Sequence, residues 1–75
     1  MHKADLPKYT LYGYTSEDTA RGCDDESGVD TIKEAKLLAK HWMTKEYMDL
    51  VESTQPVVLV QIFKGEELID EVRAA

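Results

Sequence analysis

The amino-acid sequence predicts an α+β fold with two layers, in which a three-stranded mixed sheet is covered on one face by one long helix. Three observations lead to this prediction. Residues 9–15 are rich in aromatic and β-branched side chains, which favour strands. Residues 31–53 repeat apolar side chains with the period of a helix, and residues 57–73 have the pattern of a β-hairpin. The predicted order of elements is therefore β-α-β-β.

The first predicted strand has two features that bear on packing. Tyr12 and Tyr14 share one face and Tyr9 and Leu11 share the other, because side chains alternate along a strand. We expect the tyrosines either to pack on the sheet or to form an exposed contact patch. Gly13 interrupts the strand, and a glycine in this position indicates a bulge or a close approach to the backbone.

The next segment, residues 16–29, is polar and acidic and contains Gly22 and Gly28. Connections of this length are uncommon in compact domains unless they are functional or mobile. We therefore expect a long acidic surface loop here.

The helix is expected to begin at Thr31, because Thr31 and Glu34 have the spacing of a capping box. It should end by residue 53, since Pro56 disfavours helical geometry just before it. Thr44 marks a candidate kink or restart. One broad apolar arc should cover the sheet, and its members are Ile32, Ala35, Leu38, Ala39, Trp42, Met43 and Leu50.

The C-terminal hairpin turns at Gly65-Glu66, because glycine at the first central position suits a type II′ turn. This turn pairs Lys64 with Glu67, Phe63 with Leu68, Ile62 with Ile69 and Leu59 with Val72. Apolar pairs and the opposite-charge pair across the strands stabilise that register.

The predicted hairpin carries apolar side chains on both faces. The face with the larger ones is assigned to the helix, and it consists of Val57, Leu59, Phe63, Leu68 and Val72. The opposite face is expected to be an exposed aliphatic patch with a charged border, formed by Val58, Val60, Ile62 and Ile69. Exposed apolar patches of this kind often mark interaction sites.

The first two strands are predicted to run parallel through a right-handed crossover, and the last strand to return antiparallel. Strand 57–64 is the most apolar and is the first candidate for the centre of the sheet. An order with the last strand in the centre stays open.

Composition limits the class of protein. The 75 residues are expected to form a single domain, 1–75, with a net charge of −6. That charge argues against direct binding to nucleic acid, which depends on neutralising phosphates, and no apolar run is long enough for a bilayer. A single cysteine favours a reducing, cytoplasmic compartment.

No catalytic, cofactor-binding or metal-binding site is predicted. Cys23 lies among acidic residues and has no nucleophile signature around it. The acidic run that starts at Asp24 fails the spacing of a calcium-binding EF-hand, which requires glycine where Val29 stands. One cysteine and two histidines without paired spacing do not form a structural zinc site.

The leading functional hypothesis is a small non-enzymatic protein-interaction module that forms a homodimer or binds a protein partner. Two surfaces are candidates. The first is the aliphatic patch Val58, Val60, Ile62 and Ile69. The second is a narrower helix stripe that includes Leu37, Met48 and Val51.

The alternative is an acidic inhibitor of a nucleic-acid-binding host protein. Its size and acidity are similar in kind to those of small phage and mobile-element proteins that inhibit host defence, although no motif carries that similarity. Five carboxylates would supply a surface that resembles DNA phosphates: Glu17, Asp18, Asp24, Asp25 and Glu26.

Overall fold

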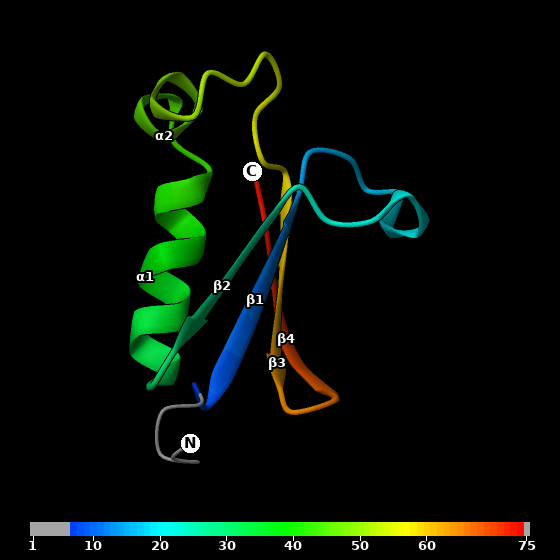
Figure 1. Ribbon diagram of the computed structural model, residues 1–75, viewed down its shortest axis with the longest axis vertical. Helices are drawn as coiled ribbons and strands as arrows, with labels where there is room; N and C mark the ends of the chain where they lie inside the picture. The colour runs from blue at the N-terminus through cyan, green and yellow to red at the C-terminus, as the bar shows by residue number, and fades with distance from the viewer. Residues whose placement is uncertain (1–6, 75) are drawn as a thin grey trace, which may run out of the picture.

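The computed structural model describes residues 7–74. Its elements are β1 (Tyr9–Tyr14), the short 3-10 helix η2 (Thr19–Arg21), β2 (Asp25–Val29), α1 (Ile32–Trp42), α2 (Lys45–Leu50), β3 (Leu59–Lys64) and β4 (Glu67–Arg73). The four strands form one antiparallel sheet in the order β2-β1-β3-β4. Both helices lie on one side of the sheet, and the loop that contains η2 lies on the other (Figure 1). The α+β class is confirmed, whereas the three-stranded mixed sheet is corrected to a four-stranded antiparallel one.

The additional strand is β2, which lies inside the segment predicted to be a loop. It pairs with β1 from Tyr9↔Val29 to Gly13↔Asp25. Its sequence, Asp-Glu-Ser-Gly-Val, is poor in strand-forming residues, so its backbone pairing with β1 has to supply the order. Because β2 reverses the chain before α1 begins, β1 and β3 run antiparallel, and the predicted parallel crossover is wrong.

The predicted helix is divided into two. Thr31 caps α1, since its hydroxyl accepts a hydrogen bond from the Glu34 backbone N–H at 3.1 Å and donates one to the Glu34 carboxylate at 3.0 Å. Thr44 caps α2 in the same way by accepting from the Tyr47 N–H at 3.1 Å. The restart predicted at Thr44 is therefore confirmed, because a hydroxyl that bonds local backbone favours a cap over a helix interior.

The end of α2 has the hydrogen bonds of a Schellman motif. The Ser53 N–H donates to the Met48 carbonyl at 3.0 Å, and the Glu52 N–H donates to the Asp49 carbonyl at 3.2 Å. Glu52 occupies the left-handed position of this motif, with φ of 56°. Glycine is the usual residue there, because a side chain in this conformation is strained.

The hairpin turn matches the prediction. Gly65 has a positive φ of 65°, and Lys64 pairs with Glu67 and Phe63 with Leu68. A β-bulge then leaves Ile69 without a partner, so Ile62 pairs with Asp70 instead of Ile69. The rest of the register is shifted by one residue, and Leu59 pairs with Arg73 instead of Val72.

The core lies between α1 and the sheet, and it corrects the predicted assignment of faces. Val60 and Ile62 have no exposed surface and pack with Leu11 beneath the helix, where Ala35, Ala39 and Trp42 lie. Val57 and Val72 also contact this core, as predicted. In contrast, Leu59, Phe63 and Leu68 belong to the opposite face of the sheet. Leu59 and Phe63 alternate along β3 with the core residues Val60 and Ile62, and Leu68 pairs with Phe63.

The physical reason for this face assignment is the contact between Trp42 and Gly13. A Cβ atom added to Gly13 would lie 2.9 Å from Cε3 of the Trp42 indole. The indole can therefore lie against this face of β1 only because Gly13 has no side chain. Gly13 pairs with Val60, and Leu11 pairs with Ile62. The position of the indole therefore places Val60 and Ile62 beneath the helix, whatever the size of the residues on the other face.

Candidate functional site

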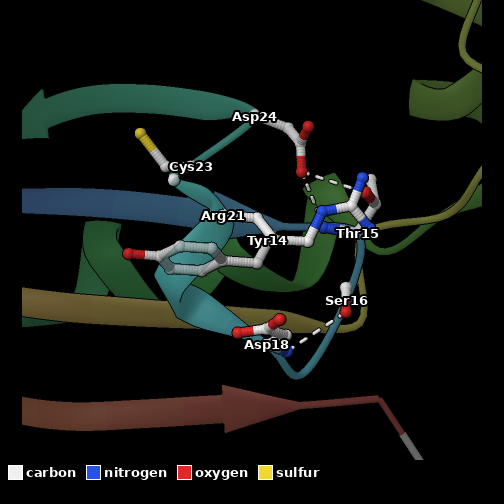
Figure 2. Close-up of a pocket in the computed structure, with 8 residues that line it drawn as sticks. Tyr14, Thr15, Ser16, Asp18, Arg21, Cys23 and Asp24 are labelled. Carbon is white, nitrogen blue, oxygen red and sulfur yellow. Dashed lines mark hydrogen bonds between the residues drawn. The ribbon is translucent and has the colours of Figure 1, made fainter.

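The loop between β1 and β2 forms a cavity with a volume of about 100 Å³ (Figure 2). It is lined by Tyr14, Thr15, Ser16, Asp18, Arg21, Gly22, Cys23 and Asp24.

The polar groups of this cavity mostly bond one another. The Asp24 carboxylate accepts hydrogen bonds from both the backbone N–H and the hydroxyl of Thr15, each at 2.9 Å. Asp18 accepts from the Ala20 N–H at 3.1 Å, and the Ser16 hydroxyl accepts from the Asp18 N–H at 3.1 Å. These contacts hold the loop in place, so the two carboxylates are already engaged in its structure.

The lone cysteine has no partner for nucleophilic chemistry among the residues that line the cavity. Cys23 is exposed, and its sulfur lies at the opposite end of the cavity from the guanidinium of Arg21 (Figure 2). No histidine is among the lining residues. The arrangement therefore lacks the base that an activated thiol needs.

The structure does not gather the five predicted acidic residues into one surface. Asp24 bonds Thr15, and the Glu17 carboxylate accepts a hydrogen bond from Arg73 at 3.2 Å. Asp25 points to the helix side, where the Tyr47 hydroxyl donates to it at 3.0 Å. Burial, with a further contribution from this bond, raises the pKa of Tyr47. Asp18 bonds the Ala20 N–H, so four of the five have internal partners, and Glu26 is exposed with no side-chain hydrogen bond among residues 7–74.

The predicted aliphatic patch is not a surface. Val60 and Ile62 are buried in the core, so they are excluded as docking residues in the folded protein. Val58 is half-buried, and Ile69 is exposed at the bulge of β4. Ile69, with 39% of its surface exposed, is therefore the one exposed member of the predicted patch.

The predicted helix stripe is divided by the break between the helices. Leu37 lies on α1 with 59% of its surface exposed, whereas Met48 and Val51 lie on α2 and just after it. Met48 is half-buried, and with Val51 it lines a small hollow beside Tyr47. Leu37 and Val51 are exposed, but they belong to different helical segments.

The face of the sheet opposite the helices presents a surface that the sequence did not predict. Pairing across the strands gives a row of uncharged residues, Gly28, Thr10, Phe63 and Leu68. The neighbouring row includes Tyr12, whose ring meets that of Phe63 edge-on at a centroid distance of 5.4 Å. Leu68 is 44% exposed, and the other side chains are half-buried. We call Thr10, Tyr12, Phe63 and Leu68 the outer band.

One end of the same face is already covered. Tyr14 and Leu59 pair across β1 and β3 and are almost completely buried, although they lie away from the helices. The loop of residues 15–24 folds over this end (Figure 1), and Glu17 of the loop bonds Arg73 of β4. Within residues 7–74, no helix and no part of this loop covers the outer band, and Pro7 lies beside it against Gly28.

A hydrogen-bonded network lies on the same face of the sheet, between the covered end and the outer band. The Tyr14 hydroxyl donates to the Gln61 side-chain carbonyl at 3.1 Å, and the Gln61 amide donates to Glu71 at 3.0 Å. Arg73 donates to the other Glu71 oxygen at 2.9 Å. The bonds from Gln61 and then Arg73 lower the pKa of Glu71, while burial is the main cause that raises the pKa of Tyr14.

The sequence signal for the outer band was present but incomplete. The cluster of tyrosines predicted either packing on the sheet or a contact patch; Tyr14 is buried, and Tyr12 is half-buried against Phe63. Phe63 and Leu68 were assigned to the core because of their size. Their place on the outer face could have been predicted only by knowing which face of the sheet Trp42 covers.

Residues 7–74 hold no candidate metal centre and no membrane-spanning helix. No group of three metal-ligating side chains lies together in that part of the chain. Within the same residues, neither helix is long and apolar enough to cross a membrane.

In comparisons with protein-family models, with curated proteins and with solved structures, the chain matched none of them.

Proposed function

We propose that this protein is a small non-enzymatic interaction module that self-associates through the outer band. The observation that carries the proposal is the Tyr12–Phe63 pair with Leu68 beside it, on the part of the outer sheet face that lies beyond the loop of residues 15–24 and away from the helices. The single cysteine is consistent with the cytoplasm as its location.

The composition of the outer band supports a protein–protein contact. Aromatic side chains are enriched in the buried centres of interfaces, because they bring large contact areas with little loss of side-chain entropy. Tyr12 and Phe63 come from neighbouring central strands, so the sheet holds them in fixed positions. A rigid aromatic centre of this kind needs little reorganisation when it binds.

Charge selects a second copy of the chain as the occupant. The four residues of the outer band are uncharged, so they can face a second copy without opposing like charges, while Glu26 and Glu71 of the same face lie at its border in the row of Tyr12. The other surfaces are less suited to self-contact. The outer side of α1 carries three lysines against one glutamate, and β4 carries Glu67, Asp70 and Glu71 against Arg73. Pairing either surface with its own copy would bring like charges together.

A charge placed in the outer band should separate the copies. We expect the wild-type chain to be dimeric by sedimentation equilibrium in the micromolar to millimolar range, and Leu68→Lys to be monomeric, because dimerisation would bury the ammonium group. Leu50→Lys is the matched control, since Leu50 is 74% exposed on α2 and far from the outer band. This control should remain dimeric, and circular dichroism should show both variants folded.

Added salt provides a second test of the same contact. Each copy carries a net charge of −6, so screening should reduce the repulsion between copies and strengthen the dimer. A monomeric wild-type chain, or a dimer that survives Leu68→Lys but is lost in Leu50→Lys, would contradict the proposal.

A further inference from the structure

The outer side of α1 is an exposed basic surface on an acidic protein. Leu37 lies at its centre with 59% of its surface exposed. The residues one helical turn away are Lys33 and Glu34 on one side and Lys40 and His41 on the other. In Figure 1 no described element lies over this side of α1. We call Lys33, Leu37 and Lys40 the α1 ridge.

Three cations of the molecule are held in ion pairs, whereas the lysines of the α1 ridge, like Lys8, Arg21 and Lys64, are in none among residues 7–74. Lys36 lies 3.6 Å from an Asp70 oxygen, Lys45 pairs with Asp49, and Arg73 pairs with Glu17 and Glu71. Within residues 7–74, no ion pair engages Lys33 or Lys40.

The one carboxylate beside the α1 ridge is used within the helix. Glu34 accepts a hydrogen bond from the Thr31 hydroxyl at 3.0 Å as part of the helix cap. The two lysines and the leucine therefore face solvent together, without a compensating acid in contact.

We propose that the α1 ridge binds an acidic segment of a different protein that carries an apolar side chain between its carboxylates. Lys33 and Lys40 are two helical turns apart and lie on either side of Leu37, so they can pair with carboxylates that flank an apolar contact. An amphipathic acidic helix has this arrangement of charges around an apolar stripe.

Charge and shape favour an acidic protein over nucleic acid. The chain carries a net charge of −6, which repels a polyanion at long range, whereas a short acidic segment approaches only the helix. Leu37 offers an apolar contact that a phosphate backbone does not use. Two copies cannot meet through their α1 ridges, because the lysines of the two ridges would repel each other.

The α1 ridge is independent of the outer band, which lies on the other face of the sheet. The two proposals can therefore fail separately. A monomeric chain can still bind an acidic segment, and a dimer can leave α1 empty.

The test uses the full chain and a synthetic peptide of about 15 residues, long enough for a marginal helix, with leucines on one face and glutamates around them. We expect nuclear magnetic resonance titration to perturb the amides of α1. The affinity should fall with added salt, since the contact depends on opposite charges. Replacing Lys33 and Lys40 with glutamine should weaken binding about tenfold, as expected from the loss of two ion pairs.

The matched control is the double variant Lys45→Gln and Lys64→Gln. It makes the same change in net charge on α2 and in the hairpin, away from the α1 ridge. Its affinity for the peptide should stay close to that of the wild type.

Leu37→Gln separates the apolar contact from the charges. It should weaken binding of the peptide, but it should not affect a version of the peptide in which the leucines are replaced by glutamine. Four results would overturn the proposal: no peptide binding, amide shifts outside α1, equal losses in the two double variants, or binding of a DNA duplex to α1 in place of the peptide.

Discussion

The contact between Trp42 and Gly13 decides which face of the sheet is the core. The indole lies against a backbone position where a Cβ would approach to 2.9 Å, and this requires glycine. Burial of Val60 and Ile62 follows from their pairing with Gly13 and Leu11. Each of these buried side chains is worth roughly 1.5–3 kcal/mol relative to an exposed one.

Gly13→Ala should therefore destabilise the protein, even though alanine is the smallest change available. We expect a loss of about 1–3 kcal/mol in the free energy of unfolding, because the added methyl group displaces the indole. Urea unfolding followed by far-ultraviolet circular dichroism measures the change.

The control for this prediction is a double-mutant cycle with Trp42→Phe. The smaller ring leaves room for the methyl group, so the cost of Gly13→Ala should be lower in that background. Equal costs in the two backgrounds would show that the methyl group and the indole do not meet.

The helical segments are defined by their capping residues. Thr31 and Thr44 each accept a hydrogen bond from a backbone N–H three residues later, so the two helices begin in the same way. The second cap takes Thr44 out of the helix and separates α2 from α1. As a result, Glu46, which a continuous helix would have turned toward the core, is exposed.

Glu52→Gly should stabilise the protein. Glu52 holds the left-handed position after α2 with φ of 56°, a conformation that costs a residue with a side chain roughly 1–2 kcal/mol. We expect thermal or urea unfolding to show a gain of about 1 kcal/mol, reduced from the full cost by the greater freedom of glycine in the unfolded chain.

Glu46→Gly is the matched control, because it makes the same replacement in the first turn of α2. It should lower the stability by about 1 kcal/mol, since glycine weakens a helix interior. If both variants lost stability, the left-handed strain at Glu52 would not be a real cost.

The edge of β4 is protected from pairing with other strands. A β-bulge at Ile69 interrupts its regular pairing, and the Asp70 carboxylate accepts a hydrogen bond from the Glu71 backbone N–H at 2.8 Å. Bulges and inward-bonded charges are common means of preventing aggregation at sheet edges. Together with its negative charge, this makes β4 a poor site for a second copy to pair with.

A hydrogen-bonded network around Glu71 connects segments that are distant in the sequence. It links β1, β3 and β4 through Tyr14, Gln61 and Glu71, and Arg73 extends it to Glu17 in the loop. Because it joins the loop to three strands, its protonation state should influence the stability of the folded chain as a whole.

Acid should weaken this network. The pKa of Glu71 is lowered below its ordinary value of 4.5, first by the bond from Gln61 and then by that from Arg73. Its contribution to stability is therefore complete above about pH 4.5, and it is lost as the pH falls through the lower pKa of the folded state. Urea unfolding at a series of pH values should show the wild type converging on Glu71→Gln as the pH decreases.

Glu66→Gln, in the exposed hairpin turn, controls for the change in net charge. A difference between the wild type and Glu71→Gln that stays constant from neutral to acidic pH would contradict this assignment.

Local signals in the sequence were sufficient for the parts of the fold that depend on neighbouring residues. The caps at Thr31 and Thr44 and the turn at Gly65 follow from residue types at short spacing. In contrast, β2 depends on backbone pairing with β1, and its own side chains give no strand signal. The bulge at Ile69 likewise shifted a register that had been derived from pairwise matching alone.

The candidate surfaces likewise divide into one that depends on neighbouring residues and one that depends on contacts between distant segments. Leu37 was identified from helical periodicity, because its exposure depends mainly on its position around α1. The outer band was missed because exposure on a sheet depends on which face the helix covers. Gly13 and Trp42 were each recognised as close-packing residues, but nothing in the sequence showed that they contact each other.

The sheet order has a consequence for how the chain could be divided. β1 and β2 form one hairpin before the helices and β3 and β4 form another after them, and the strands of the two hairpins pair along β1 and β3. A cut between α2 and β3 would yield two fragments, each with an open strand edge and half of the core. Neither fragment could bury Leu11 and Ile62 alone, so reassembly of the fragments would restore both the sheet and the interior in one step.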